Sequence, residues 1–247
     1  MTDLITLDSS NFDFSEVVDM TEMFYECSSL ESVNLDNIDT SKVKYMKEMF
    51  SECTALHSID LSNFQNNEVQ TMQSMFSMCE NLVSINLNSF RTSSIKNMIS
   101  IFDQWLKLKS LDLSSFETNK VIDMEKMFAS SSALVSLDLR NFDTSSVPNI
   151  MRMFNECTNL KLLNLKSFTY ESLSDGYIDD MFNNCNQSMI YCINKDNTPD
   201  DIKNLLSNFL NLYCSNDCYQ NEDNKILSCN KTCIEDCKND NIQYLLL

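Results

Sequence analysis

The sequence of 247 residues predicts an α/β repeat solenoid, with short parallel strands stacked on one side and helices on the other. Three observations predict this class. Leucines recur at intervals of 26 residues, a short alternating segment follows each of them, and a segment rich in methionine and phenylalanine completes each unit. Because equal units repeat at a fixed interval, each unit is expected to pack mainly on its neighbours. The leucines are Leu30, Leu56, Leu82, Leu108, Leu134 and Leu160.

The alternating segments are the predicted strands. Segments such as "LHSIDL" and "LVSLDL" follow the L-x-x-L-x-L pattern of a leucine-rich-repeat strand. Strands that recur once per unit must run in the same direction, so we expect one parallel sheet along the solenoid.

The segment "VKYMKEMFSEC" (residues 43–53) and its equivalent in each other unit are predicted to be amphipathic helices. At about 100° per residue, Val43, Met46, Met49, Phe50 and Cys53 fall within an arc of roughly 120°. A polar "DTS", "RTS" or "ETN" before the segment is expected to supply helix N-cap oxygens. In other units methionine exchanges with isoleucine, and cysteine exchanges with tryptophan or serine. We interpret these positions as fillers of apolar volume and not as soft metal ligands.

Residues 1–187 are predicted to form the solenoid, in about seven units, and residues 188–247 a helical, cysteine-rich cap. The cap includes "TPDDIKNLLSNFL", with Thr198 as the helix N-cap and Pro199 at the first helical position. Six clustered cysteines suggest three disulfides, with structural zinc or free thiols as alternatives. They are Cys192, Cys214, Cys218, Cys229, Cys233 and Cys237. Asn186 and Asn230 begin glycosylation sequons.

Composition excludes several functions. With 36 acidic and 18 basic side chains, the chain carries a net charge of −18, which disfavours nucleic acid and anionic membrane surfaces. No apolar run approaches the roughly 20 residues of a membrane span, so we expect no membrane insertion in this chain. The start of the chain lacks signal-peptide features. One histidine and one glycine leave little for acid–base catalysis or phosphate loops, so we expect no enzyme, catalytic residue, cofactor or metal centre.

The candidate binding site is a column of Asp and Asn side chains, one per unit, which we call the Asx column. Each lies between the last two leucines of its strand and is expected to face outward from the sheet. The residues form either a hydrogen-bonded row or a polar strip for a basic peptide, a glycan or a weakly held divalent cation, with Asp112 beside Asp138 as the candidate cation pair. The column comprises Asp8, Asn34, Asp60, Asn86, Asp112, Asp138 and Asn164.

The unit "LxSLDLSxFDTSxVxxMxxMFxxCxxL" resembles the repeat of BspA-like leucine-rich-repeat surface proteins, the type found in mycoplasma lipoproteins. The resemblance covers about residues 4–187 and is clearest in "SLDLSSFETNKVIDMEKMF" and "SLDLRNFDTSSVPNIMRMF". It implies a right-handed leucine-rich-repeat solenoid with a concave parallel sheet and convex helices, displayed at a cell surface and linked to adhesion. The resemblance implies no catalytic residues.

From these observations we expect a non-enzymatic recognition module, secreted or at the cell surface, that binds a protein or glycan ligand along the concave strip. Host and matrix proteins are among the candidate ligands, and nucleic acid is not expected to bind. The alternative is an intracellular leucine-rich-repeat scaffold for protein–protein interaction.

Overall fold

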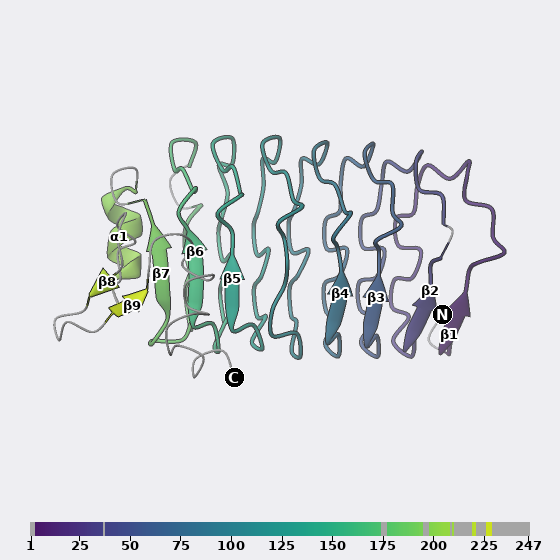
Figure 1. Cartoon of the computed structure of the whole chain (residues 1–247), viewed down its shortest axis with the longest axis horizontal. Coiled ribbons are helices and arrows are strands. Elements are labelled where there is room, and N and C mark those ends of the chain that lie inside the picture. Colours follow the sequence, from purple (N-terminus) through teal and green to yellow (C-terminus); the bar gives the residue numbers. More distant parts are fainter. Residues whose placement is uncertain are drawn as a thin grey trace.

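The computed structural model describes residues 3–36, 38–173, 177–194, 198–207, 209, 219–220 and 226–228. In this part the chain is a parallel-strand β-solenoid of about seven turns (Figure 1). The strands of the solenoid are β1 (Thr6–Asp8), β2 (Ser32–Asn34), β3 (Ser58–Asp60), β4 (Ser84–Asn86), β5 (Ser136–Asp138), β6 (Leu162–Leu165) and β7 (Ile190–Ile193). The other elements are α1 (Asp200–Leu206), β8 (Tyr219–Gln220) and β9 (Ile226–Ser228).

The predicted parallel stacking of the strands is confirmed. β1 pairs with β2, β3 pairs with β4, and β5, β6 and β7 form a three-stranded sheet, all in parallel register. In the β1–β2, β3–β4 and β5–β6 pairs the Asx column is aligned, as where Asp8 lies opposite Asn34. The sheet is interrupted between β2 and β3 and between β4 and β5. In the second gap, the intervening turn of the solenoid joins β5 through a single bridge, Ser110 to Ser136. The sheet continues through β7, past the predicted boundary at residue 187.

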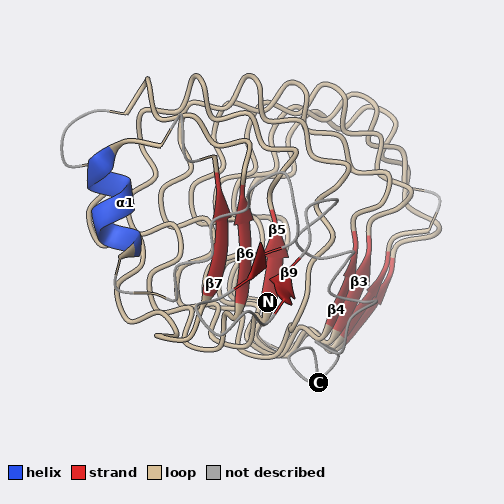
Figure 2. Cartoon of the chain, turned by 60° about the vertical axis from the view of Figure 1, so that its left-hand side comes forward, coloured by secondary structure: helices blue, strands red, loops and turns tan. Residues whose placement is uncertain are grey.

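The helices predicted inside the units are wrong. Figure 2 shows loops and turns along the side of the solenoid where they were expected, and residues 47–52 form turns. The backbone N–H groups of Glu48, Phe50 and Glu52 do not bond within the segment. They donate to carbonyls of the next turn of the solenoid, at 2.9 Å in each case. This wall of the solenoid is therefore held by bonds between units.

Left-handed backbone conformations make this wall possible. Fourteen described residues, none of them glycine, have positive φ, two in each turn; Glu48 has φ 55° and Glu52 has φ 62°. Such a conformation costs a non-glycine residue roughly 1–2 kcal/mol. Here it turns the N–H of each residue along the solenoid axis; Glu48 and Glu52, for example, both donate to the next turn. The inter-unit hydrogen bonds offset the cost of the conformation.

The threonine hydroxyl of the "DTS", "RTS" and "ETN" segments does not cap a helix, so that prediction is also wrong; Thr118 of "ETN" is an example. Thr118 is 2% exposed. Its Oγ1 donates to the carbonyl oxygen of Asp143 at 2.9 Å and accepts the N–H of the same residue at 2.7 Å. The side chain thus bonds to the backbone of the following unit. The same position is buried in five units, at Thr40, Asn66, Thr92, Thr118 and Thr144.

The core contains a continuous stack of phenylalanine rings, one from each turn. Neighbouring rings have centroid distances of 5.1–6.4 Å and lie within 23° of parallel. These side chains are 0–6% exposed. The interior position predicted for them is confirmed, and the stack explains why phenylalanine recurs there without substitution. The rings are Phe24, Phe50, Phe76, Phe102, Phe128, Phe154 and Phe182.

The cysteine position of the unit supplies a hydrogen-bond donor and not volume alone. The thiol of Cys53 donates to the carbonyl of Phe24, in the preceding turn, at 3.1 Å. Where the position holds Trp105, its indole N–H donates to the corresponding phenylalanine carbonyl at 2.9 Å, and where it holds Ser131, the hydroxyl does so at 2.5 Å. The thiol, the indole and the hydroxyl each provide a hydrogen-bond donor. This explains how three such different residues can occupy the same position in different units. Cys79, Cys157 and Cys185 make the same bond.

The buried thiols predict a loss of stability at alkaline pH. Burial raises the pKa of Cys53 and of Cys185 to about 12 each, above the value of about 8.5 for a free thiol. Between these values the unfolded chain releases protons that the folded chain retains. The free energy of unfolding should therefore fall as pH rises above about 9, by up to about 1.4 kcal/mol per pH unit for each thiol.

Urea unfolding at pH 7, 9 and 10 measures this effect. The double variant Cys53→Ser, Cys185→Ser keeps a donor, as Ser131 does naturally, but removes two titrating groups. Its stability should fall less steeply above pH 9 than that of the unmodified chain. Equal slopes for the two proteins would contradict the explanation.

The predicted helix after the repeats is confirmed as α1, although its N-cap is Pro199 and not Thr198. The hydroxyl of Thr198 instead donates to the carbonyl of Asn194 at 2.6 Å. Ile202 and Leu206 are buried. Just beyond α1, the ring of Phe209 packs on Phe182, the last ring of the stack, with 5.8 Å between the ring centroids. Figure 1 shows α1 beside β7, at the C-terminal end of the described solenoid.

Candidate functional site

The Asx column runs along the outward face of the sheet. Five of its seven members are the last residue of their strand, whereas Asn164 precedes Leu165 in β6 and Asp112 lies outside the strands. In each residue the side-chain oxygen Oδ1 accepts the backbone N–H two residues later, as in Asp60 to Ser62 at 2.8 Å and Asp112 to Ser114 at 2.9 Å. Such Asx turns redirect the chain at the end of a strand. The other five members make the same bond at 2.9–3.2 Å.

Most of the Asx column is also accessible to a ligand. Asp8, Asp60 and Asp112 are exposed, whereas Asn164 is only 3% exposed. Hydrogen bonds from the serines two residues later hold the pKa of all three exposed carboxyls below its usual value. Each therefore stays ionised at neutral pH, with its second oxygen directed away from the turn bond. The predicted hydrogen-bonded row is seen between two neighbouring members, where Nδ2 of Asn34 donates to Oδ1 of Asp8 at 3.1 Å. The alternative, a polar strip for a ligand, stays a prediction.

The predicted cation pair is not isolated. Asp138 forms an ion pair with Arg140, whose Nε lies 3.2 Å from Oδ2. Among the described residues there is no group of three or more His, Cys, Asp or Glu side chains that could hold a metal ion. Asp112 and Asp138 therefore do not form a cation site with further carboxylates in this part of the chain.

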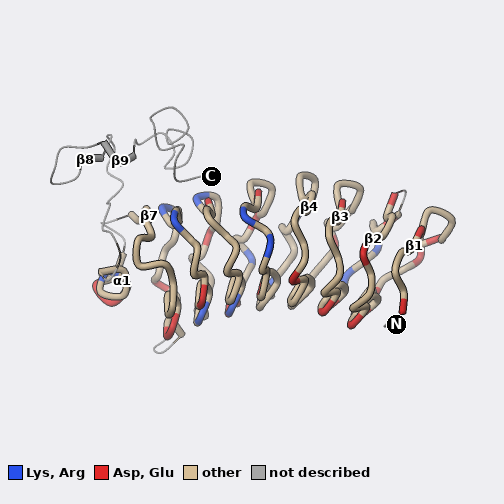
Figure 3. Tube along the Cα trace, turned by 90° about the horizontal axis from the view of Figure 1, so that it is seen from below, with Lys and Arg blue, Asp and Glu red and all other residues tan. Residues whose placement is uncertain are grey.

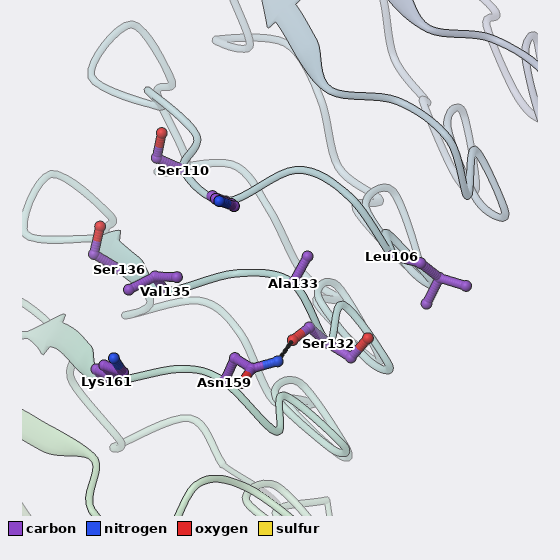
Figure 4. A pocket seen from close by; sticks show the side chains of 9 residues that line it. Leu106, Ser110, Ser132, Ala133, Val135, Ser136, Asn159 and Lys161 are labelled. Atoms are coloured by element: carbon purple, nitrogen blue, oxygen red, sulfur yellow. Dashed lines mark hydrogen bonds between the residues drawn. The ribbon is translucent and has the colours of Figure 1, made fainter. Parts of the chain in front are cut away.

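A pocket of about 620 Å³ lies on the sheet side, along the turn that contains Ser110, the turn of β5 and the turn of β6. Lys109 and Lys161 line it, together with Ser110, Ser136 and Val135. Figure 4 shows Ser110, Val135, Ser136 and Lys161 on one side of the pocket, with Leu106, Ala133, Ser132 and Asn159 opposite. We call this the Lys109–Lys161 pocket.

The two lysines of the pocket are unpaired within the described part of the chain. Neither Lys109 nor Lys161 forms an ion pair or a side-chain hydrogen bond there. They replace the uncharged or acidic residues that most other units carry at this strand position, such as Glu31, Val83 and Val135. The sequence analysis did not predict this pocket, although the two lysines at this strand position were a sign of it.

The charges of the chain are divided along the solenoid. Residues 1–85 contain 15 acidic and 3 basic side chains, whereas residues 86–173 contain 9 acidic and 10 basic side chains. Figure 3 shows Lys and Arg gathered in the turns between β4 and β7. The Lys109–Lys161 pocket therefore lies in the part of the chain where basic side chains about equal acidic ones in number, and not in the strongly acidic first 85 residues.

The predicted disulfide and glycosylation residues are only partly described. Cys192 is buried on β7, 2% exposed, and is not one of the free thiols. Cys214, Cys218, Cys229, Cys233, Cys237 and Asn230 lie outside the residues whose surroundings are described. Asn186 is half-buried, and its Oδ1 accepts the N–H of Ser188 at 2.9 Å. No described helix is long and apolar enough to cross a membrane.

Comparison with known proteins gives one family. The family model described as "Mycoplasma protein of unknown function, DUF285" matches residues 2–85 and 78–195, which together cover most of the solenoid. Searches of curated proteins and of solved structures find no match.

Proposed function

Because the chain belongs to the family of Mycoplasma proteins of unknown function, DUF285, we propose that it is a non-enzymatic recognition module for a protein or glycan partner. The partner binds along the outward face of the parallel sheet. The observation that carries the proposal is the aligned row of polar side chains there: exposed Asp8 lies opposite exposed Asn34, and exposed Asp60 opposite half-buried Asn86. A regular array of this kind offers a long ligand one contact per turn.

The small residues beside the Asx column support the same face as the contact surface. Ser32, Ser58 and Ser84 precede the Asx residue by two positions and are exposed. Side chains at alternate strand positions point to the same side of a sheet, so serine and Asx side chains share one face. Their short side chains let a partner approach the sheet closely, and the exposed carboxylates of Asp60 and Asp112 supply directed acceptors.

The proposed setting is the cell surface or the extracellular space, in adhesion to host or matrix components. The resemblance to BspA-like leucine-rich-repeat surface proteins supports this setting. Disulfides among the six C-terminal cysteines are part of the proposal, with the segment from α1 onward capping the solenoid. Burial of Ile202 and Leu206 and the contact between Phe209 and Phe182 support the cap.

The triple variant Asp60→Asn, Asp112→Asn, Asp138→Asn tests the face. Asparagine keeps the Oδ1 acceptor of each Asx turn and removes only the charge, so the melting temperature should change little. Biolayer interferometry against a panel of purified matrix proteins and glycans should show at least one ligand that binds the unmodified chain. We expect the triple variant to bind that ligand roughly tenfold more weakly, as for about 1.4 kcal/mol of lost interaction.

A matched control is available on another part of each turn of the solenoid. Asp13, Asp39 and Asp143 also form Asx turns, with serines two residues later. Changing these three to asparagine alters the net charge equally and should leave binding intact. Equal losses in the two triple variants would indicate a general charge effect, and unchanged binding in both would remove the sheet face as the site.

A further inference from the structure

We propose that the Lys109–Lys161 pocket binds an acidic saccharide, one that carries carboxylate or sulfate groups. This inference rests on the proposed recognition function and names a ligand class for one position on the same face. Lys109, Lys161, and the serine and apolar side chains beside them together carry it.

The unpaired state of the two lysines is the first reason. Three other cations of these turns are neutralised: Lys126 pairs with Glu125 at 3.3 Å, Arg140 with Asp138 at 3.2 Å and Arg152 with Asp180 at 3.2 Å. Lys96, Lys107 and Lys120 form no ion pair among the described residues either, but they lie outside the pocket. Lys109 has no such partner among the described residues, and neither does Lys161. Two unneutralised ammonium groups beside one concave site attract an anion, and a partly enclosed surface strengthens that attraction.

The spacing of the lysines favours an extended ligand with repeated anionic groups. Lys109 and Lys161 occupy equivalent positions two turns apart, with uncharged Val135 between them. Parallel strands stack about 4.8 Å apart, so the two backbones are roughly 10 Å apart. A lysine ammonium is a compact point charge that accepts carboxylate or sulfate without a fixed fork geometry. One acidic group of an oligosaccharide can thus meet each lysine.

The rest of the lining fits a sugar better than an acidic peptide. The hydroxyls of Ser110 and Ser136 make no hydrogen bond to the described chain, and Figure 4 shows them projecting side by side from neighbouring turns. Val135 and Leu106 add apolar surface, and Leu106 is 41% exposed. A sugar ring presents both hydroxyl groups and a C–H face to such a lining. The volume of about 620 Å³ lies within the range of roughly 300–1,000 Å³ typical of small-ligand sites.

The charge division of the chain gives the pocket its selectivity. The first 85 residues, with 15 acidic and 3 basic side chains, repel a polyanion, whereas the next 88 residues do not. A polyanionic saccharide is therefore directed to the turns between β4 and β7, which contain the pocket. Binding should weaken as salt screens these charges.

Isothermal titration calorimetry with four probes tests the proposal on the full chain. Hyaluronan hexasaccharide carries carboxylates, chondroitin sulfate hexasaccharide carries carboxylates and sulfates, chitohexaose is neutral, and hexaglutamate is an acidic peptide. We expect the two acidic saccharides to bind, more weakly at 300 mM than at 50 mM salt, and chitohexaose not to bind. Binding of neither acidic saccharide, or hexaglutamate binding as tightly as they do, would overturn the saccharide assignment.

Two variants locate the site. Lys109→Gln with Lys161→Gln should weaken acidic-saccharide binding about tenfold or more, because both charge-assisted contacts are lost. Lys96→Gln with Lys120→Gln makes the same change in net charge at two exposed lysines outside the pocket and should have little effect. Equal effects of the two double variants would overturn the pocket as the site.

A third variant introduces a negative charge into the pocket to neutralise the two lysines. Val135→Glu places a carboxylate between the two lysines, and the repeat itself carries glutamate at this position, as Glu31. The variant should fold normally and lose saccharide binding. If these variants do not affect binding of a partner found with the matrix panel, and no acidic saccharide binds, the pocket proposal fails while recognition by the sheet face stands.

Discussion

Phe128→Ala is expected to lower the free energy of unfolding by about 3–5 kcal/mol, the usual cost of truncating a fully buried phenylalanine. The Phe128 side chain is fully buried and lies in the middle of the ring stack. Its centroid is 5.5 Å from that of Phe102 and 5.7 Å from that of Phe154. Alanine removes both ring contacts and leaves a cavity that the rigid turns above and below cannot close.

Urea unfolding followed by circular dichroism measures this loss. Ile122→Ala is the control, because Ile122 lies only six residues away but is 53% exposed. Its change should stay within about 0.5 kcal/mol. In a solenoid each turn contacts only its neighbours, so Phe128→Ala should also broaden the transition by uncoupling the turns on its two sides. A loss below about 1 kcal/mol would show that the ring stack contributes little to stability.

Thr118→Val should lower the free energy of unfolding by about 2–3 kcal/mol, somewhat less than the loss of a core ring. Valine matches threonine in shape but removes the hydroxyl, which both donates to and accepts from the backbone of Asp143. One carbonyl and one N–H group of the next turn then lose a partner. An unsatisfied buried group costs about 1–3 kcal/mol, and partial access of water to this backbone keeps the sum near the lower end.

The repeat provides the control for this change. Asn66 occupies the equivalent position, and its amide also bonds to the backbone of the next turn, at Arg91. Thr118→Asn should therefore retain most of the stability that Thr118→Val loses. If the two variants are equally unstable, the contribution of Thr118 comes from its shape and not from its hydrogen bonds.

The period of the sequence was sufficient to predict the parallel strands but misled on the other wall. Met46, Met49, Phe50 and Cys53 follow helical spacing, and all four are buried. Each turn of the solenoid has two left-handed residues four positions apart, and this backbone buries the same side chains as a helix would. Interior positions therefore do not distinguish the two backbones. The scarcity of glycine increased the difficulty, since left-handed residues are usually glycine and here they are Glu, Ser, Lys and others.

The candidate site was predictable in part. The outward direction of the Asx column followed from strand alternation alone, because the period of two fixes which residues share a face. The Asx turns and the pairing of Asp138 with Arg140 depend on how the chain bends after each strand, which the alternation does not specify. The Lys109–Lys161 pocket depends on how successive turns of the solenoid stack, and the sequence marked it only by two lysines at one strand position.

The sequence by itself determined the repeat length, the parallel strands, the buried set of side chains and the division of charge along the chain. These properties depend on spacing and residue type, which are linear. The tertiary structure decided where each backbone N–H finds its acceptor. Glu48 has a local acceptor in a helix and a distant one in a solenoid turn, and only the presence of Gln73 in the next turn selects the second. That choice replaced helices with turns, and it gave Cys53, Trp105 and Ser131 their common role as donors.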